Sequence, residues 1–288
     1  MKKQKTSKIN NKNSNELYFE RFDPFSRFLH VLVIVSFLSL ALTGMTIKFS
    51  NVAIFQTISG FLGGYEVTSV VHRFAALITA AYFFMHLGHL YKKLKSGIIR
   101  WKDLFVGEDS MVPNKNDFIE FYQTVKWFFG LGPRPRYGRW TYWEKFDYFA
   151  VFWGVAVIGS SGLLLWFPEF FTSLGIPGWM INVATIVHSD EALLATGFIF
   201  TVHFFNTHFR PEKFPMDTVI FTGAITLEEL KEERPRQYEY LLKNNELDKH
   251  LTDAPSPKLL RAAKIFGFIA LSIGIMLVIL SIYSLLFL

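Results

Sequence analysis

The chain contains no cysteine among its 288 residues. This absence excludes disulfides, thiolate zinc sites, thiolate-ligated iron–sulfur clusters and covalently attached c-type haem. Charged residues are also scarce, at 19%, whereas 51% of the residues are hydrophobic and 17% are aromatic. A soluble domain of this length is rarely so apolar, so the composition indicates a membrane protein. Any redox group must be held by histidine, methionine or carboxylate side chains, or without a covalent link.

Five apolar runs are each long enough to cross a bilayer, which requires about 20 mostly apolar residues in a helix. They cover residues 28–48, 67–91, 147–167, 182–206 and 264–287. The second and fourth runs contain histidines and a few charges, as helices do when one side faces a protein interior. These runs predict an all-α integral membrane protein.

The basic residues gather in alternate connections between these runs. Eleven lie between Lys92 and Lys145, and nine lie between Arg210 and Arg261, whereas the other two connections contain only Lys48. The positive-inside rule then predicts the topology of a protein in the inner membrane. The N-terminus and both long loops lie in the cytoplasm, and the C-terminus lies outside. The net charge of +6 therefore reflects topology rather than nucleic-acid binding.

The same pattern divides the chain into four parts. We expect a disordered basic tail over residues 1–20, a helical bundle over 21–210 with a cytoplasmic loop at 92–146, a second cytoplasmic loop at 211–262, and a last transmembrane helix over 263–288. Within the second loop, the charged stretch Leu227–Leu242 predicts a surface helix. Both loops could dock a soluble partner or could be solvated connections.

An internal repeat relates the first two apolar runs to the next two. Equivalent residues recur at offsets of 116 or 118, which indicates a duplicated helical hairpin and its following loop. Two such hairpins would pack as a four-helix bundle with the fifth helix appended, and bundle cores commonly hold cofactors. The repeated pairs are His72 with His188, Phe105 with Phe221, Gly107 with Gly223, and Gly44 with Gly162.

Seven of the eight histidines in the chain lie in the first, second and fourth runs or at their ends. A histidine inside a membrane is costly and is functional by default, although a single one is often a helix–helix hydrogen bond. Seven on three helices point to a shared function. They are His30, His72, His86, His89, His188, His203 and His208.

The spacing of four histidines predicts two paired sites. His72 and His86 are 14 residues apart, and His188 and His203 are 15 apart, so each pair spans about 21 Å on one broad helix face. The two helices run in the same direction, so one pair can meet near each membrane surface. A b-type haem needs two ligands on opposite sides of a flat ring. Ligands so far apart cannot share one ion, so haem is favoured over a metal or proton transporter.

Near the cytoplasmic surface, which we call the inner level, the helices contain more histidines than one haem requires. His30 either replaces His86 as the partner of His203, or a third haem uses two of His30, His89 and His208. An α-helix places His208 about 140° around from His203, which favours a different direction for His208. For His89 and His208, an interfacial hydrogen bond is an equal alternative. Five glycines in these helices either leave room for the haem macrocycle or allow ordinary close packing of helices. They are Gly44, Gly154, Gly159, Gly162 and Gly197.

The stretch Arg27-Phe28-Leu29-His30, with Leu42-Thr43-Gly44 at the end of the helix, resembles the cytochrome b subunits of formate dehydrogenases, nickel–iron hydrogenases and thiosulfate reductases. His72, His188 and His203 match the same pattern, over residues 20–210. The resemblance implies that His72 and His188 hold an outer haem, and that His30 and His203 hold an inner haem near a quinone pocket. The added His86, whose 14-residue spacing is similar to that in cytochrome b6, leaves the inner ligand open between His30 and His86.

The resemblance also implies exchangeable quinone or menaquinone and a redox partner subunit, either an iron–sulfur protein or a multihaem cytochrome c. A stand-alone transmembrane reductase for an external acceptor is the alternative. Arg73 is a candidate for a haem propionate, or for an ion pair with Asp190 or Glu191. No catalytic residue is assigned. A quinone site also needs groups that exchange protons, and the inner-level candidates are Asp23, Arg27, Glu144, Asp147 and Tyr148.

Overall fold

The computed structural model describes residues 17–287, and each of the five predicted membrane runs is helical in it. All five helices are long and apolar enough to cross a membrane. The fourth run begins as α8 and continues through two π-helical segments, η1 and η2. The bounds are α1 Pro24–Lys48, α3 Gly64–Lys95, α6 Tyr142–Trp166, α8 Trp179–Phe198, η1 Ile199–His203, η2 Phe205–Phe209 and α12 Pro257–Phe287.

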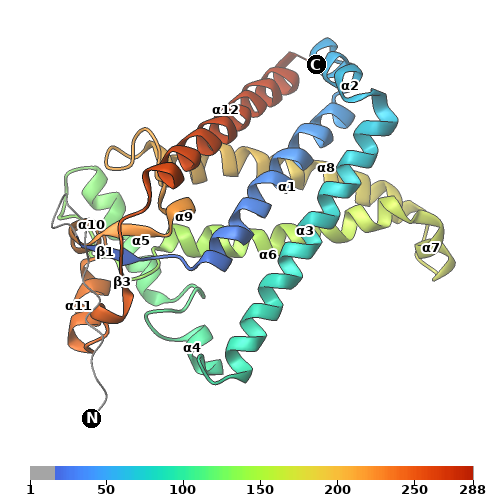
Figure 1. The fold of residues 1–288 in the computed structure, drawn as a ribbon. Helices are drawn as coiled ribbons and strands as arrows, with labels where there is room; N and C mark the ends of the chain where they lie inside the picture. Colours follow the sequence, from blue (N-terminus) through green and yellow to red (C-terminus); the bar gives the residue numbers. More distant parts are fainter. Residues whose placement is uncertain (1–16, 288) are drawn as a thin grey trace.

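Two helical hairpins form the body of the molecule, as the repeat predicted. Helix α1 packs along α3, and α6 packs along α8. The short helices α2 (Ala53–Leu62) and α7 (Pro168–Ser173) follow the first helix of each hairpin. Figure 1 shows α2 and α7 at one end of the bundle, which we call the far end, and the small β-sheet near the opposite end, which we call the sheet end.

The fifth helix is part of the core. Helix α12 packs against α1 and η1, and a core cluster there includes Phe55, Phe200 and Leu277. Gly274 makes this close approach possible, because a Cβ atom at that position would lie 2.5 Å from the ring of Phe200. The fifth helix therefore supports the π-helical part of the fourth run.

A small folded unit caps the sheet end. Strand β1 (Tyr18–Glu20) lies between β2 (Ala224–Thr226) and β3 (Leu251–Thr252), antiparallel to both. A second core cluster forms beneath this sheet from Phe19, Ile225, Leu230 and Leu241. The helices of this unit are α4 Trp101–Phe105, α5 Lys115–Phe128, α9 Val219–Thr222, α10 Leu227–Glu233, α11 Pro235–Lys243 and the 3-10 helix η3 Leu247–His250.

This unit corrects two predictions. The disordered tail was expected to reach residue 20, but residues 18–20 form the central strand of the sheet; residues 1–16 lie outside the described residues. The single surface helix expected over Leu227–Leu242 is instead two helices, α10 and α11, which meet at Arg234. The reason is Pro235, which has no amide hydrogen to continue a helix and therefore begins a new one.

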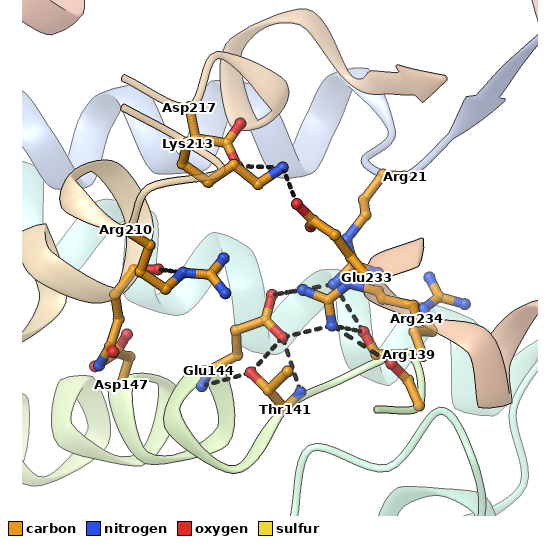
Figure 2. Close-up of polar contacts among 12 residues, drawn as sticks. Arg21, Arg139, Thr141, Glu144, Asp147, Arg210, Lys213, Asp217, Glu233 and Arg234 are labelled. Atoms are coloured by element: carbon orange, nitrogen blue, oxygen red, sulfur yellow. Dashed lines mark hydrogen bonds and ion pairs between the residues drawn. The ribbon is translucent and has the colours of Figure 1, made fainter. Parts of the chain in front are cut away.

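Buried ion pairs hold the unit onto the bundle. Figure 2 shows the carboxylate of Glu144, in the first turn of α6, beside the guanidinium groups of Arg21 and Arg234, at 3.0 and 2.9 Å. Burial and the nearby charge of Arg234 lower the pKa of Arg21 to about 9. Lys145 and Asp117 form a second buried pair at 2.9 Å. Ion pairs therefore hold both long loops against the bundle.

Candidate haem-binding sites

The far-end site is formed by one histidine from each hairpin. The rings of His72 on α3 and His188 on α8 lie with their centroids 6.2 Å apart. Nδ1 of His188 donates to the carbonyl of Ile158 at 2.9 Å, and Nδ1 of His72 lies 2.9 Å from Oγ1 of Thr43. A hydrogen bond at Nδ1 sets the ring orientation and leaves Nε2 available as a ligand.

The same two-residue motif supports each histidine within its own hairpin. A Cβ atom on Gly44 would lie 3.3 Å from Cε1 of His72, and one on Gly162 would lie 2.9 Å from Cε1 of His188. The preceding residues, Thr43 and Ser161, place their hydroxyl groups 2.9 and 3.3 Å from the Nδ1 atoms. The duplication therefore includes a hydroxyl–glycine pair as well as a histidine. The sequence signal for this pair is a hydroxyl residue directly before each repeated glycine.

The far-end geometry fits a haem iron. With about 2 Å for each metal–nitrogen bond and about 1 Å from nitrogen to ring centre, two axial imidazoles have centroids about 6 Å apart. The observed separation is 6.2 Å. Both Nδ1 atoms have partners in α1 or α6, so Nε2 remains the free nitrogen of each ring. The separation of the His72 and His188 rings is therefore the one that ligation of a haem iron would require.

At the sheet end, the histidines have partners of a different kind. Nδ1 of His203 donates to the carboxylate of Asp147 at 2.8 Å, and Nε2 of His86 lies 2.9 Å from the hydroxyl of Tyr148. Asp147 and Tyr148 are neighbours on α6. His30 on α1 lies close enough to His203 to interact with it electrostatically. Of the two candidate partners of His203, His86 has its Nε2 atom bound to Tyr148, whereas His30 has no side-chain hydrogen bond within residues 17–287.

A model of the family described as prokaryotic cytochrome b561 matches residues 21–211, about two-thirds of the chain. The chain belongs to the prokaryotic cytochrome b561 family. No curated protein matches it. The predicted resemblance to membrane cytochrome b subunits is confirmed, and the chain is a multi-pass membrane protein that transfers electrons with haem b.

The π-helical turns in this cytochrome b561 chain correct the expected direction of His208. The amide of Phe204 bonds to the carbonyl of Ile199, five residues back, which makes a wider turn than an α-helix. His208 consequently lies close enough to His203 and His30 to interact electrostatically with both. Its Nδ1 atom accepts the amide hydrogen of Asp217 at 3.3 Å. An α-helical count from the sequence cannot anticipate such a turn.

The other candidate residues of the cytochrome b561 chain have separate partners. The ring of His89 packs against that of Phe25 in a tilted arrangement with centroids 4.6 Å apart, and its Nε2 atom is buried without a hydrogen-bond partner in residues 17–287. Asp23 caps α1 by accepting the amide hydrogen of Ser26 at 2.8 Å, and Arg27 donates to the carbonyl of Phe221 at 2.8 Å. Asp23 and Arg27 therefore have structural roles.

The predicted ion pairs of Arg73 are not formed. Its guanidinium lies over the ring of Trp166, 5.6 Å from the centroid. Asp190 pairs with Lys48 at 3.3 Å, and Glu191 accepts a hydrogen bond from Trp153. The two acids lie where α8 faces α1 and α6, so they bind residues of those helices. An Arg73 contact with a haem propionate stays a prediction.

The glycines separate into two groups. Gly44 and Gly162 lie against the far-end histidines, whereas a Cβ atom on Gly159 or Gly197 would meet no described atom within 4 Å. The second pair therefore borders open space rather than a close helix–helix contact. Within residues 17–287, no three His, Asp or Glu side chains are grouped so that they could hold a metal ion. Paired histidines, as haem requires, are the arrangement present.

Proposed function

We propose that this protein is the membrane subunit of a redox complex and passes electrons across the bilayer between a quinone pool and a partner subunit. The single observation that carries the proposal is the His72–His188 pair, with centroids 6.2 Å apart and both Nδ1 atoms held by the adjacent helices. A bound haem b accepts and gives up one electron at a time. Thr43 and the carbonyl of Ile158 orient the two histidine ligands.

We assign two haems to the two levels. His72 and His188 are the far-end ligands, and His30 and His203 are the sheet-end ligands. The hydrogen bond between His86 and Tyr148 supports this choice, because it occupies the nitrogen that His86 would need for iron. The contact of His203 with Asp147 supports it as well, because a carboxylate on Nδ1 is a common orienting partner of a ligating histidine.

The two levels lie apart along the fourth membrane run, with His188 in α8 and His203 in η1. His188 and His203 are 15 residues apart, which corresponds to about 22 Å along a helix. Electrons would therefore cross most of the hydrocarbon region between the two sites. The basic loops favour a cytoplasmic sheet end and an external far end. A quinone reaction also moves protons, and the His86–Tyr148 pair beside the sheet-end site is a suitable group for that exchange.

The partner at one end would be a protein with its own redox centres. The proposed classes are an iron–sulfur protein and a multihaem cytochrome c, because both exchange single electrons with haem. His89 and His208 are not needed as ligands in this assignment. His208 binds the backbone of Asp217 through Nδ1, and His89 packs against the ring of Phe25.

Haem content per chain tests the ligand assignment. His188→Ala should remove the far-end haem, and His203→Ala should remove the sheet-end haem, each measured by the pyridine haemochrome spectrum of the purified protein. The matched control is His86→Phe, which removes a histidine of the same helix as His72 and should keep both haems. Full haem content in His188→Ala, or loss of a haem in His86→Phe, would contradict the assignment.

Reduction by quinol tests the proposed exchange partner. Purified protein in liposomes should be reduced by a menaquinol analogue, with the sheet-end haem reduced first. The His203→Ala variant should slow this reduction strongly, whereas His188→Ala should leave the first electron transfer intact. Equal rates in the two variants would argue against a quinone site at the sheet end.

A further inference from the structure

Helix α5 has its acidic side chains buried and most of its aromatic side chains exposed. Asp117 and Glu120 are 7% and 4% exposed, whereas Phe118 and Phe128 are 74% and 73% exposed. A surface helix in water has the opposite distribution, with its apolar stripe against the core. The apolar side of α5 must therefore face something other than water.

The buried side of α5 is fully explained by its partners. Asp117 pairs with Lys145 of α6 at 2.9 Å, and Glu120 pairs with Arg236 at 2.7 Å. One turn further along, Oγ1 of Thr124 lies 2.8 Å from the hydroxyl of Tyr137. Three polar residues on one side thus hold α5 in a fixed orientation against the rest of the chain.

The two exposed sides of α5 differ in chemistry. Phe118 and Val125 project about 140° and 160° away from Gln123 around the helix axis, at 100° per residue. The polar residues Asn116 and Gln123 lie on one exposed side, flanked there by Ile119 and Trp127, which are less exposed than the phenylalanines. The other side is a continuous apolar stripe of exposed residues, Phe118, Phe121, Tyr122, Val125, Phe128 and Phe129. Lys115 and Lys126 lie on the arc between the two exposed sides.

The apolar stripe continues onto a membrane helix. The ring of Phe121 lies 5.5 Å from that of Tyr142, in the first turn of α6. Tyr142 is followed on the same side of α6 by Phe146, Phe149 and Trp153, all of them exposed outward. Since α6 spans the membrane, this row faces lipid. Helix α5 therefore lies at the level where that lipid-facing row begins.

We propose that α5 lies in the membrane interface, with the stripe of Phe118, Phe121, Tyr122, Val125, Phe128 and Phe129 inserted among the lipids and the side of Asn116 and Gln123 in water. A helix with an aromatic face and flanking lysines is typical of interfacial binding, because the rings enter the acyl boundary and the lysines meet anionic headgroups. Helix α5 is thus a lipid anchor for the sheet-end unit.

The absence of cysteine makes a direct test possible. Single cysteines are introduced as Phe118→Cys and Val125→Cys on the stripe and Gln123→Cys as the matched control on the same helix. Each full-length variant is spin-labelled and placed in vesicles of phosphatidylcholine and phosphatidylglycerol. Haem content equal to that of the unmodified protein shows that a variant has folded, and Tyr122→Cys replaces either stripe variant that fails this check.

The measurement is the collision of the label with oxygen, which concentrates in lipid, and with a water-soluble nickel complex. We expect labels at positions 118 and 125 to collide several-fold more with oxygen than with nickel, and the label at 123 to show the reverse. Nickel access at all three positions would overturn the proposal. Protection from both reagents at 118 and 125 would also overturn it, because it would show a protein partner or a second copy on the stripe.

Discussion

The far end and the sheet end of the bundle hold their histidines in different ways. At the far end, His72 and His188 are oriented by a hydroxyl and a backbone carbonyl, which carry no charge. At the sheet end, His203 is oriented by the carboxylate of Asp147. A carboxylate partner makes the imidazole a stronger donor to iron and favours the oxidised state. The comparison predicts that the sheet-end haem has the lower reduction potential.

The two ends also differ in what holds the surrounding helices. The far end relies on close packing, with Gly44 and Gly162 against imidazole rings. The sheet end relies on charge, with Glu144 between Arg21 and Arg234 and with Lys213 bound to Asp217, Glu229 and Glu233. The duplicated hairpin therefore retains the same shape at one end and acquires new contacts at the other, where the two long loops are added.

The largest expected effect is the loss of the far-end haem alone. Gly162→Leu places a side chain where a Cβ atom would already lie 2.9 Å from His188, so the ring must move away from the iron position. We expect one of the two proposed haems to be lost, measured by the haemochrome spectrum. The control is Gly159→Leu on the same helix, where the Cβ atom meets no described atom. Two haems in Gly162→Leu would show that His188 is not held by α6.

The next effect concerns the stability of the sheet end. Glu144→Gln removes the charge that Arg21 and Arg234 share, leaving two largely buried guanidinium groups. We expect a loss of about 2–4 kcal/mol in the free energy of unfolding, measured by thermal unfolding in detergent. Glu239→Gln, which affects an exposed pair with Arg136, should change it little. Equal effects of the two variants would mean that the ion cluster does not hold the unit in place.

A smaller effect tests whether the charge of Asp147 sets the difference in reduction potential between the two ends. Asp147→Asn keeps a hydrogen-bonding group near Nδ1 of His203 but removes the negative charge. We expect the reduction potential of the sheet-end haem to rise by about 60 mV, a tenfold change in a one-electron equilibrium, in a redox titration followed by absorbance. The far-end potential should stay unchanged. A shift in both haems, or in neither, would argue against the assignment of His203.

The smallest effect is expected at Thr43. Thr43→Val preserves the shape of the side chain but removes the hydroxyl 2.9 Å from Nδ1 of His72. Since that hydroxyl is uncharged, the far-end potential should change by less than in Asp147→Asn at the sheet end. Both haems should be retained. A larger shift than that of Asp147→Asn would reverse the proposed contrast between the two ends.

Much of the fold is predictable from the sequence because its signals are local. Apolar length defines the five membrane helices, and the repeat of His72 and Gly44 at His188 and Gly162 defines two hairpins. Helix direction then brings His72 and His188 to the same level, where the structure places them 6.2 Å apart. These features depend on residue spacing within a helix and on the number of membrane crossings.

Contacts between distant segments could only be decided by the tertiary structure. Asp147 and His203 are 56 residues apart in the chain, and Tyr148 and His86 are 62 apart; no local pattern predicts either pair. The π-helical turns at 199–209 alter the direction of His208, and α12 supports them. Strand β1 forms because residues 224–226 and 251–252 reach it from the other end of the chain. Composition and spacing thus determine the membrane helices and their histidines, whereas packing between helices determines which partner each histidine meets.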